Sequence, residues 1–484
     1  MSAASLWPAA RSFTLPRIAI ISILLVAVIL FRDTWLPTAR GCTPAYKQPA
    51  PLAPQEDGKP LVEIDTSPHP PLPPASNADV DCRSLPGADR VMVILKTGAT
   101  ELYQKLPTHF VTTFKCVPNF TIFSDLNQTF ADVQIHDAIA PVSQKIREEH
   151  EDFKLYREIE KWQREGQDMS KLQGGNGWNL DKWKFLPMFH QVFETADDKI
   201  DWFVMIEADT SLSWLNLLLW LQKMDPKKPY YLGAQNVIGD TTFAHGGSAV
   251  VVSRKAADTI AAARQNAGKE RYDESWERET AVACCGDEIL ARAFLAVEIP
   301  LTPAWPLIQG ETISTIDFTH HHWCTPAITW HHVTPMEVDQ HWQFQLDWAE
   351  EHGWQHEYLH GNIFDHFVAQ HVSVNRTSWN NLSKDKKFVA AHLAEKDDTD
   401  FYKLKDFQQR AVESEELCAE ACIREGDGEC IQWMWAPGRC HLGRDIRFGK
   451  SDEREEQHWN CGWIQDRIEK FRKSMSGCDI KWQG

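Results

Sequence analysis

Short apolar runs alternate with helical patterns between residues 90 and 295 of the chain. The apolar runs are 90–96 (RVMVILK), 120–123, 202–206 (WFVMI) and 248–252. The helical patterns cover 141–164, 180–194, 213–224, 255–265 and 288–295. The runs are short enough for strands that are buried on both faces, as in a parallel sheet. Strands that alternate with helices predict an α/β fold with nucleotide-type topology, in which ligands bind beyond the carboxyl ends of the strands.

Two carboxylates follow the apolar run 202–206 directly. Glu207 and Asp209 are two residues apart at this strand end. Hard oxygen ligands suit magnesium or manganese, and such a cation can bridge nucleotide phosphates that bare carboxylates would repel. The same side chains could instead cap the helix that follows. The spacing alone leaves both interpretations open.

Three further segments carry candidate site residues. Gly246 and Gly247 precede the strand at 248–252, where glycine allows a close approach to a ligand or simply forms a turn. Asp287 opens a predicted helix, where the helix dipole favours its charged form, either as a cap or as a base. His331 lies beside or within a short strand and could complete a metal site begun by Asp209, although an isolated histidine is more often structural.

The N-terminal region predicts a membrane anchor. Residues 18–31 (IAIISILLVAVILF) carry no charge, and extended over 18–36 they form a signal-anchor segment. The excess of positive charge before it predicts a cytosolic tail over 1–17 and a lumenal location for the rest. A cleaved signal peptide and a buried helix are the alternatives. Proline recurs through residues 43–80, which predicts an extended stem over 37–85.

Charge and cysteine content restrict the class of protein further. The formal net charge is −18, so the chain lacks the positive field that nucleic-acid binding uses, and no nucleic-acid partner is expected. Half of the 12 cysteines lie between Cys418 and Cys478, which predicts a disulfide-stapled module over 405–484. A zinc site is the alternative, but this segment has no CxxC pair. N-glycosylation sequons begin at Asn119, Asn127, Asn375 and Asn381, in agreement with a lumenal location.

Four motifs, in order, resemble glycosyltransferase family 31, the fringe and core-1 galactosyltransferase group. The resemblance covers about residues 86–345. The motifs are 202–210 (WFVMIEADT), 243–249 (FAHGGSA) with SRK at 253–255, 286–288 (GDE) and 330–335 (WHHVTP). The family's acidic triplet is Glu-Ala-Asp here, with Ala208 in place of an acid, which leaves donor preference and metal affinity open.

The resemblance implies a GT-A type, Rossmann-like nucleotide-sugar domain over 86–400. It implies a Golgi or endoplasmic reticulum enzyme that needs Mn²⁺, or Mg²⁺, and that moves galactose or N-acetylglucosamine from a UDP-sugar donor to a glycan hydroxyl. The product would be a β-1,3-type linkage, formed with inversion. Asp209 and His331 would bind the metal, and Glu207 would act through water or on the ribose. Asp287 would be the general base, and Asp125 would lie near the uridine.

The implied reaction is a single displacement. A carboxylate accepts the proton of the acceptor hydroxyl as its oxygen attacks the anomeric carbon, and the metal neutralises charge on the departing diphosphate. The alternative function is a catalytically silent protein of the same fold that binds glycans or proteins.

Residues 417–442 resemble the PAN/Apple fold, in which one helix packs on a small sheet. The resemblance implies an α+β module with the bridges Cys418–Cys440 and Cys422–Cys430, and it implies binding of a protein or carbohydrate, or scaffolding. We further predict a bridge between Cys461 and Cys478. The pairing of Cys82, Cys116, Cys284, Cys285 and Cys324 is open.

Overall fold

The computed structural model describes residues 82–174, 177–425 and 428–482. The predicted cytosolic tail 1–17, the signal anchor 18–36 and the stem as far as residue 81 lie outside the described residues. Across the described ranges, no helix is both long enough and apolar enough to cross a bilayer.

An eight-stranded sheet forms the larger part of the fold, in the order β11-β7-β10-β5-β1-β2-β4-β3. The strands are β1 (Val91–Lys96), β2 (Asn119–Ser124), β3 (Gln128–Phe130), β4 (Val133–Asp137), β5 (Trp202–Glu207), β7 (Tyr231–Gly233), β10 (Val250–Ser253) and β11 (Leu301–Pro303). Strands β5, β1, β2 and β4 run parallel, whereas β10 runs antiparallel between β5 and β7. The α/β class is therefore confirmed, with a sheet that is mostly parallel.

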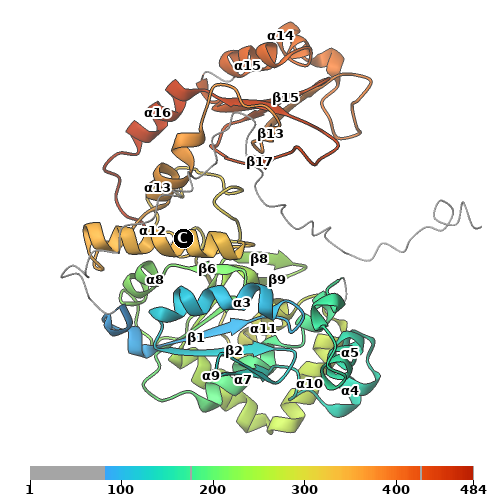
Figure 1. The fold of residues 1–484 in the computed structure, drawn as a ribbon, viewed down its shortest axis with the longest axis vertical. Helices are drawn as coiled ribbons and strands as arrows, with labels where there is room; N and C mark the ends of the chain where they lie inside the picture. Colours follow the sequence, from blue (N-terminus) through green and yellow to red (C-terminus); the bar gives the residue numbers. More distant parts are fainter. Residues whose placement is uncertain (1–81, 175–176, 426–427, 483–484) are drawn as a thin grey trace, which may run out of the picture. The chain divides into compact units, whose positions relative to one another are not determined.

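Helices cover both faces of this sheet (Figure 1). One face is covered by α3 (Leu102–Val111), α8 (Trp214–Leu221) and α12 (Pro335–His352). The other is covered by α7 (Phe185–Thr195), α9 (Arg254–Ala267) and α11 (Gly286–Leu295). The remaining helices of this region are α4 (Gln144–Glu149), α5 (Lys154–Arg164), α6 (Gly177–Asp181) and α10 (Lys269–Val282). The predicted helices over 141–164 and 180–194 are each interrupted by a turn.

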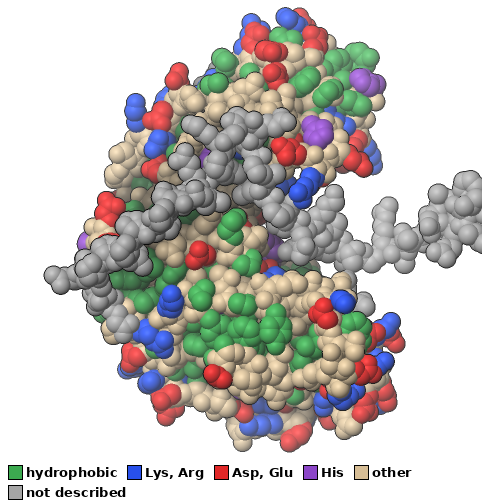
Figure 2. Space-filling view, in the orientation of Figure 1, with side chains coloured by type: hydrophobic (Ala, Val, Ile, Leu, Met, Phe, Trp, Pro, Cys, Tyr) green, Lys and Arg blue, Asp and Glu red, His purple; other side chains and the backbone are tan. Residues whose placement is uncertain are grey.

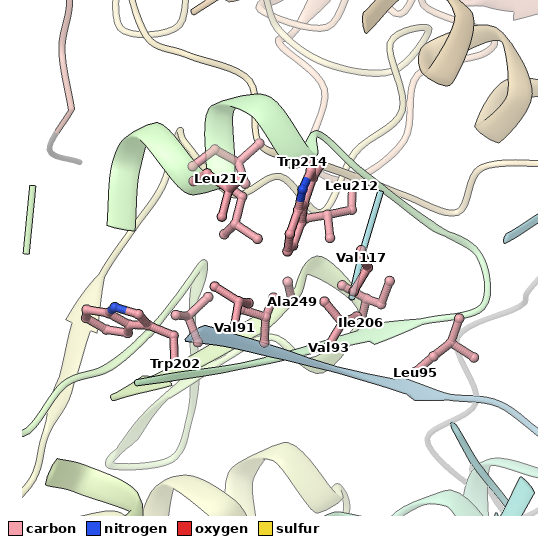
Figure 3. Close-up of a cluster of buried hydrophobic side chains, with 14 of the residues drawn as sticks. Val91, Val93, Leu95, Val117, Trp202, Ile206, Leu212, Trp214, Leu217 and Ala249 are labelled. Atoms are coloured by element: carbon pink, nitrogen blue, oxygen red, sulfur yellow. The ribbon is translucent and has the colours of Figure 1, made fainter. Parts of the chain in front are cut away.

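The central strands bury apolar side chains on both faces. Val93 of β1 packs on the same side as Ile206 of β5, whereas Ile94 and Phe203 face the opposite cluster. Figure 3 shows the first of these clusters, with Trp214 and Leu217 of α8 and strand residues such as Val93 directed toward one another. Because both faces are covered, these strands read as continuous apolar runs and not as an alternating pattern.

A second sheet lies in the C-terminal region. It has the order β14-β16-β15-β18, and neighbouring strands are antiparallel. The strands are β14 (Lys386–Val389), β15 (Gln432–Ala436), β16 (Arg439–Gly443) and β18 (Asn460–Trp463). Helix α15 (Glu415–Arg424) is joined to this sheet region by Cys418–Cys440 and Cys422–Cys430. Because β14 pairs with β16, the small sheet includes residues that precede 405, the predicted start of the module.

The predicted bridge between Cys461 and Cys478 is wrong. Cys461 is a free thiol, and β18 directs it into a buried apolar cluster. Cys478 follows α16 (Gln465–Ser474) and pairs instead with Cys324. The chain returns there to the loop around residue 324, where the Lys481 N–H donates to the Cys324 carbonyl at 2.9 Å. Of the other cysteines whose pairing the sequence left open, Cys82 pairs with Cys116 and Cys284 pairs with Cys285.

The four sequons differ in access. Asn127 and Asn375 are exposed, and Asn119 is half-buried. The Asn381 side chain is fully buried, and its Nδ2 donates to the Trp433 carbonyl at 3.1 Å. A glycan on this nitrogen would displace Trp433 from the sheet, so Asn381 is not a glycosylation site of the folded chain.

Acidic and basic side chains are interspersed over the face of the molecule shown in Figure 2. No broad basic patch is present on that face, as expected for a chain with a net charge of −18.

Candidate functional site

The carboxyl ends of three parallel strands meet at one edge of the large sheet. Lys96, the last residue of β1, lies in register with Phe123 of β2 and with Glu207 of β5. Strand β10 is antiparallel, so its first residue lies at this same edge, directly after the turn that holds Gly246 and Gly247. The sheet therefore gathers the predicted residues that follow β2 and β5 with those that precede β10.

A short strand pair brings Asp209 and His331 together. Strand β6 (Thr210–Leu212) pairs with β12 (Thr329–His331), and the register places His331 opposite Thr210. His331 Nδ1 lies 3.6 Å from Asp209 Oδ1. His332 adds a third possible ligand, and the three ligand atoms lie within 4.8 Å of one another. Since two atoms that ligate one small cation are about 3 to 4 Å apart, the separation fits a shared metal ion.

The protonation states also suit a metal ion. Burial lowers the pKa of His331 to about 4, so its imidazole is neutral near pH 7, as coordination requires. Burial alone would raise the pKa of Asp209, but the nearby Lys105 ammonium favours the ionised carboxylate, and the pKa is lowered overall. An ionised carboxylate and a neutral imidazole form a donor set that fits Mn²⁺.

Lys105 contacts the other oxygen of Asp209. Its Nζ lies 3.1 Å from Asp209 Oδ2 and 2.7 Å from Glu101, both within reach of α3. Oδ1 faces His331 and the candidate metal position, whereas Oδ2 faces the Lys105 ammonium. The sequence does not mark Lys105 as a site residue, because it lies on an ordinary polar helix face.

The two glycines are required by neighbouring protein side chains. A Cβ at Gly247 would overlap the His331 ring, and a Cβ at Gly246 would lie 2.7 Å from the Phe185 ring. The glycines therefore let His331 and Phe185 approach the backbone in front of β10. This is a more specific role than the turn or the ligand contact that the sequence left open.

Asp287 lies in the first turn of α11 and is oriented by two backbone groups. Its Oδ2 accepts from the Gly246 N–H at 2.9 Å, and its Oδ1 accepts from the Glu288 N–H at 2.9 Å. Burial raises the pKa of Asp287, and the nearby Glu207 carboxylate adds to the increase. The two hydrogen bonds stabilise the start of α11 and hold the Asp287 carboxylate at the edge of the sheet where the metal candidate lies.

A chain of alternating charges runs along the same edge. Buried Lys96 lies 2.5 Å from Asp181 and 3.0 Å from Glu207. Buried Lys184 lies 3.4 Å from Asp181 and 3.2 Å from Asp125. Burial opposes the charge on Lys96, but its two carboxylate neighbours raise its pKa above the ordinary value. The only sequence signal of this network is that Lys96 ends an apolar strand with a charge.

Asp125, which the family resemblance places near the uridine, is engaged by protein groups at both carboxylate oxygens. Asp125 is buried, and its Oδ1 accepts from the Ala99 N–H at 2.6 Å while its Oδ2 lies beside Lys184. The side chain therefore orients the loop after β1 and the neighbouring lysine.

A disulfide joins the adjacent residues Cys284 and Cys285, directly before Gly286 and Asp287. The sequence analysis left the pairing of these two cysteines open.

Comparison of the chain with family models and with curated proteins found no match.

Proposed function

We propose that this chain is a metal-dependent, inverting glycosyltransferase of GT-A type that uses a UDP-sugar donor and a glycan hydroxyl as acceptor. The proposal rests chiefly on one observation: the β6–β12 pairing brings Asp209 and His331 to within 3.6 Å at the carboxyl edge of an α/β sheet. This is the edge at which α/β sheets bind nucleotides. The ordered motifs that resemble glycosyltransferase family 31 supply the substrate class.

In this proposal Asp209 and His331 hold Mn²⁺ or Mg²⁺, with His332 available as a third ligand. When bound, the metal would neutralise the charge that develops on the departing diphosphate. Lys96 neutralises Glu207, which reduces the excess of negative charge that a diphosphate would meet at this edge.

Asp287 is the proposed general base. Its carboxylate takes the proton of the acceptor hydroxyl, the hydroxyl oxygen forms a bond to the anomeric carbon, and the bond to the diphosphate oxygen breaks. Because burial raises the pKa of Asp287, its carboxylate is a stronger base than an exposed aspartate. A single displacement of this kind turns an α-linked donor into a β-glycoside.

The proposed location is the lumen of the Golgi or of the endoplasmic reticulum, with a single N-terminal anchor. The disulfides of the described chain agree with an oxidising compartment. We propose galactose or N-acetylglucosamine as the transferred sugar and a β-1,3-type linkage as the product, on the family resemblance alone.

A catalytically silent binding protein of the same fold is the second candidate. It is favoured by Ala208 in the acidic triplet and by the Lys105 ammonium, which already neutralises part of Asp209. Such a protein would bind UDP without turning over any donor.

The test is release of UDP from a panel of UDP-sugars by the full-length chain, with manganese or with EDTA. We expect manganese-dependent release from at least one donor. Asp287→Asn should lose transfer and keep UDP binding, whereas Asp198→Asn, at an exposed position, should keep both. Metal-dependent UDP binding without turnover of any donor would support the silent protein, and absence of UDP binding would contradict both candidates.

A further inference from the structure

A short connection joins α10 to α11, and a disulfide lies within it. Helix α10 ends at Val282 and α11 begins at Gly286, so residues 283–285 form the whole connection. Two of these residues, Cys284 and Cys285, are bridged to each other. A bridge between neighbours closes a small ring that contains the peptide bond between them, which reduces the number of backbone conformations that the connection can adopt. No step of the proposed reaction uses this bridge.

The bridge is poorly placed to stabilise the fold as a whole. A disulfide stabilises mainly by constraining the unfolded chain, and this effect grows with the length of the loop that it closes. The sequence separation is 1 for Cys284–Cys285, compared with 154 for Cys324–Cys478. Cys284 is also exposed and Cys285 is half-buried, so the pair adds little to the core. The effect of this bridge is therefore local to the connection.

Protein contacts hold the chain on both sides of the bridge. Before it, the Lys182 ammonium donates to the Ala283 carbonyl at 3.2 Å. After it, a Cβ at Gly286 would overlap the Phe185 ring and would lie 2.6 Å from the Lys182 carbonyl oxygen, so the backbone of Gly286 packs directly against the start of α7. The bridged pair is the segment that remains between these two contacts, and the disulfide fixes its conformation.

Helix α11 begins without a side-chain cap. Cys285 occupies the N-cap position, and its side chain makes no capping hydrogen bond within the described chain. A serine, threonine, aspartate or asparagine at this position would accept from the backbone N–H of the second or third helical residue. The third helical residue is Glu288, and its N–H donates instead to Asp287 Oδ1 at 2.9 Å. A cysteine in a disulfide thus leaves this N–H to the Asp287 carboxylate.

We propose that the Cys284–Cys285 disulfide positions the Asp287 carboxylate, because it fixes the start of α11 without a side-chain cap that would compete for the Glu288 N–H. Asp287 is half-buried, and its Oδ2 accepts from the Gly246 N–H at 2.9 Å, so its orientation depends on where α11 begins. The two cysteines are positioning residues, and their value for catalysis rests on the proposed function. A base must lie within hydrogen-bond reach of the proton that it accepts, and a displacement of about 1 Å can cost about 100-fold in rate.

Mass spectrometry of the full-length chain tests the bridge itself. The unreduced chain is denatured in N-ethylmaleimide and then digested. We expect no label on Cys284 or Cys285, whereas Cys461, a free thiol, should be labelled and serves as the positive control. Labelling of both Cys284 and Cys285 would overturn the proposal.

Cys284→Ala with Cys285→Ala removes the bridge. We expect kcat for UDP release from the UDP-sugar panel to fall roughly 10- to 100-fold, while KM for the donor and the affinity for UDP change little. Hydrogen exchange of the peptide that contains Gly246 should become faster, because the Gly246 amide donates to Asp287 Oδ2. Unchanged kcat together with unchanged exchange would refute the positioning role.

Cys422→Ala with Cys430→Ala is the matched control, because it removes another short bridge, whose sequence separation is 8. This bridge lies in the C-terminal region, so kcat and the exchange at Gly246 should both stay at the wild-type values. An equal fall of kcat in the control would mean that loss of any bridge lowers activity, which would overturn the proposal.

Cys284→Ala with Cys285→Ser separates orientation from helix stability. A serine at the N-cap would cap α11, and it would compete with Asp287 for the Glu288 N–H. We expect this variant to be at least as thermally stable as the double alanine variant, whereas its kcat stays at least tenfold below that of the wild type. Recovery of kcat to the wild-type value would show that the bridge acts only through the stability of the helix, which would overturn the proposal.

The two proposals fail separately, since hydrogen exchange is measured without donor, metal or acceptor. Faster exchange at Gly246 in the double alanine variant, with no UDP release by the wild type, would support the positioning of Asp287 and contradict the proposed function. UDP release by the wild type, with unchanged exchange at Gly246 in the variant, would overturn the positioning role and leave the proposed function in place. Faster exchange with unchanged kcat would overturn the catalytic value of the bridge.

Discussion

The eight-stranded sheet and the four-stranded sheet are stabilised in different ways. The large sheet is covered on both faces by helices, and its central strands contribute apolar side chains to two buried clusters. The small sheet also contributes to two apolar clusters, one on the side of α15 and one that includes Met434 and Trp463. Two disulfides join α15 to the sheet region. Apolar burial thus supports both regions, and covalent cross-links supplement it on the α15 side of the small sheet.

Both regions bury charged side chains. Burying lysines and carboxylates costs free energy, which a large apolar core can offset. The large sheet carries the buried pairs of Lys96 and Lys184 at its carboxyl edge, together with Asp209 and His331. The small module buries charge as well, since the Arg447 side chain is 1% exposed and pairs with Asp317 and Asp385. Because the candidate site lies at the edge of the large sheet, we expect changes there to act on chemistry, and changes in the small module to act on local stability.

Asp209→Asn should have the largest effect. It removes the carboxylate ligand and keeps the size of the side chain. Because a metal ion contributes several kcal/mol of charge stabilisation, kcat/KM for manganese-dependent UDP release should fall on the order of 10³-fold. The control is Asp198→Asn. An unchanged manganese titration in Asp209→Asn would remove this residue from the site.

Replacing both cysteines of the Cys418–Cys440 bridge by alanine should destabilise the small module by about 3 kcal/mol, since the closed loop spans 22 residues. Peptide-resolved hydrogen exchange should show faster exchange around α15, while UDP release by the large region stays unchanged. Cys461→Ala, at a buried free thiol, should have a much smaller effect. Equal loss of UDP release in the bridge variant would show that the two regions are not independent.

Acidification should weaken both regions through buried histidines. Burial lowers the pKa of His190 in the large region and of His441 in the small one to about 4 each. The unfolded chain therefore binds more protons than the folded chain between pH 6.5 and 4. Stability is full above pH 6.5 and falls toward pH 4, by about 2 kcal/mol per histidine at pH 5. Urea unfolding at pH 7.5 and at pH 5 measures this difference.

His190→Phe and His441→Phe each remove one of these groups. Each variant should lose less stability than the wild type between the two pH values, and the reduction should appear in its own region by hydrogen exchange. If both variants show the same pH dependence as the wild type, the two histidines are not neutral in the folded chain near pH 5.

Ile206→Val should have the smallest effect, because it removes one methylene from the fully buried cluster of Figure 3. We expect a loss of about 1 kcal/mol in the free energy of unfolding. Ile238→Val, at a position that is 38% exposed, is the matched control and should be close to neutral. Similar losses in both variants would argue against a tightly packed core around β5.

The strands of the large sheet were predictable because their signal is local. The runs 90–96 and 202–206 became β1 and β5 almost unchanged. The run 248–252 is shifted, since Gly246–Ser248 forms a turn and β10 begins at Val250. The predicted bridge between Cys461 and Cys478 failed because the spacing of cysteines does not show that β18 directs Cys461 inward.

The candidate site was only partly predictable. Asp209 and His331 were recognised from a motif resemblance, and the structure places them side by side. The charged partners Lys96, Asp181 and Lys184 were not recognised, because they come from different segments and have no periodic pattern of their own.

The amino-acid sequence by itself determined the α/β class, the cysteine-rich C-terminal module and the residue types available for a metal site. These follow from composition, from short continuous apolar runs and from the helical periodicity of about 3.6 residues, all of which are properties of neighbouring residues in the chain. Tertiary structure decided which side chains meet: His331 with Asp209, Lys96 between two carboxylates, and Cys324 with Cys478. Such contacts depend on strand register and helix packing between distant segments, and these are settled only when the whole core is buried.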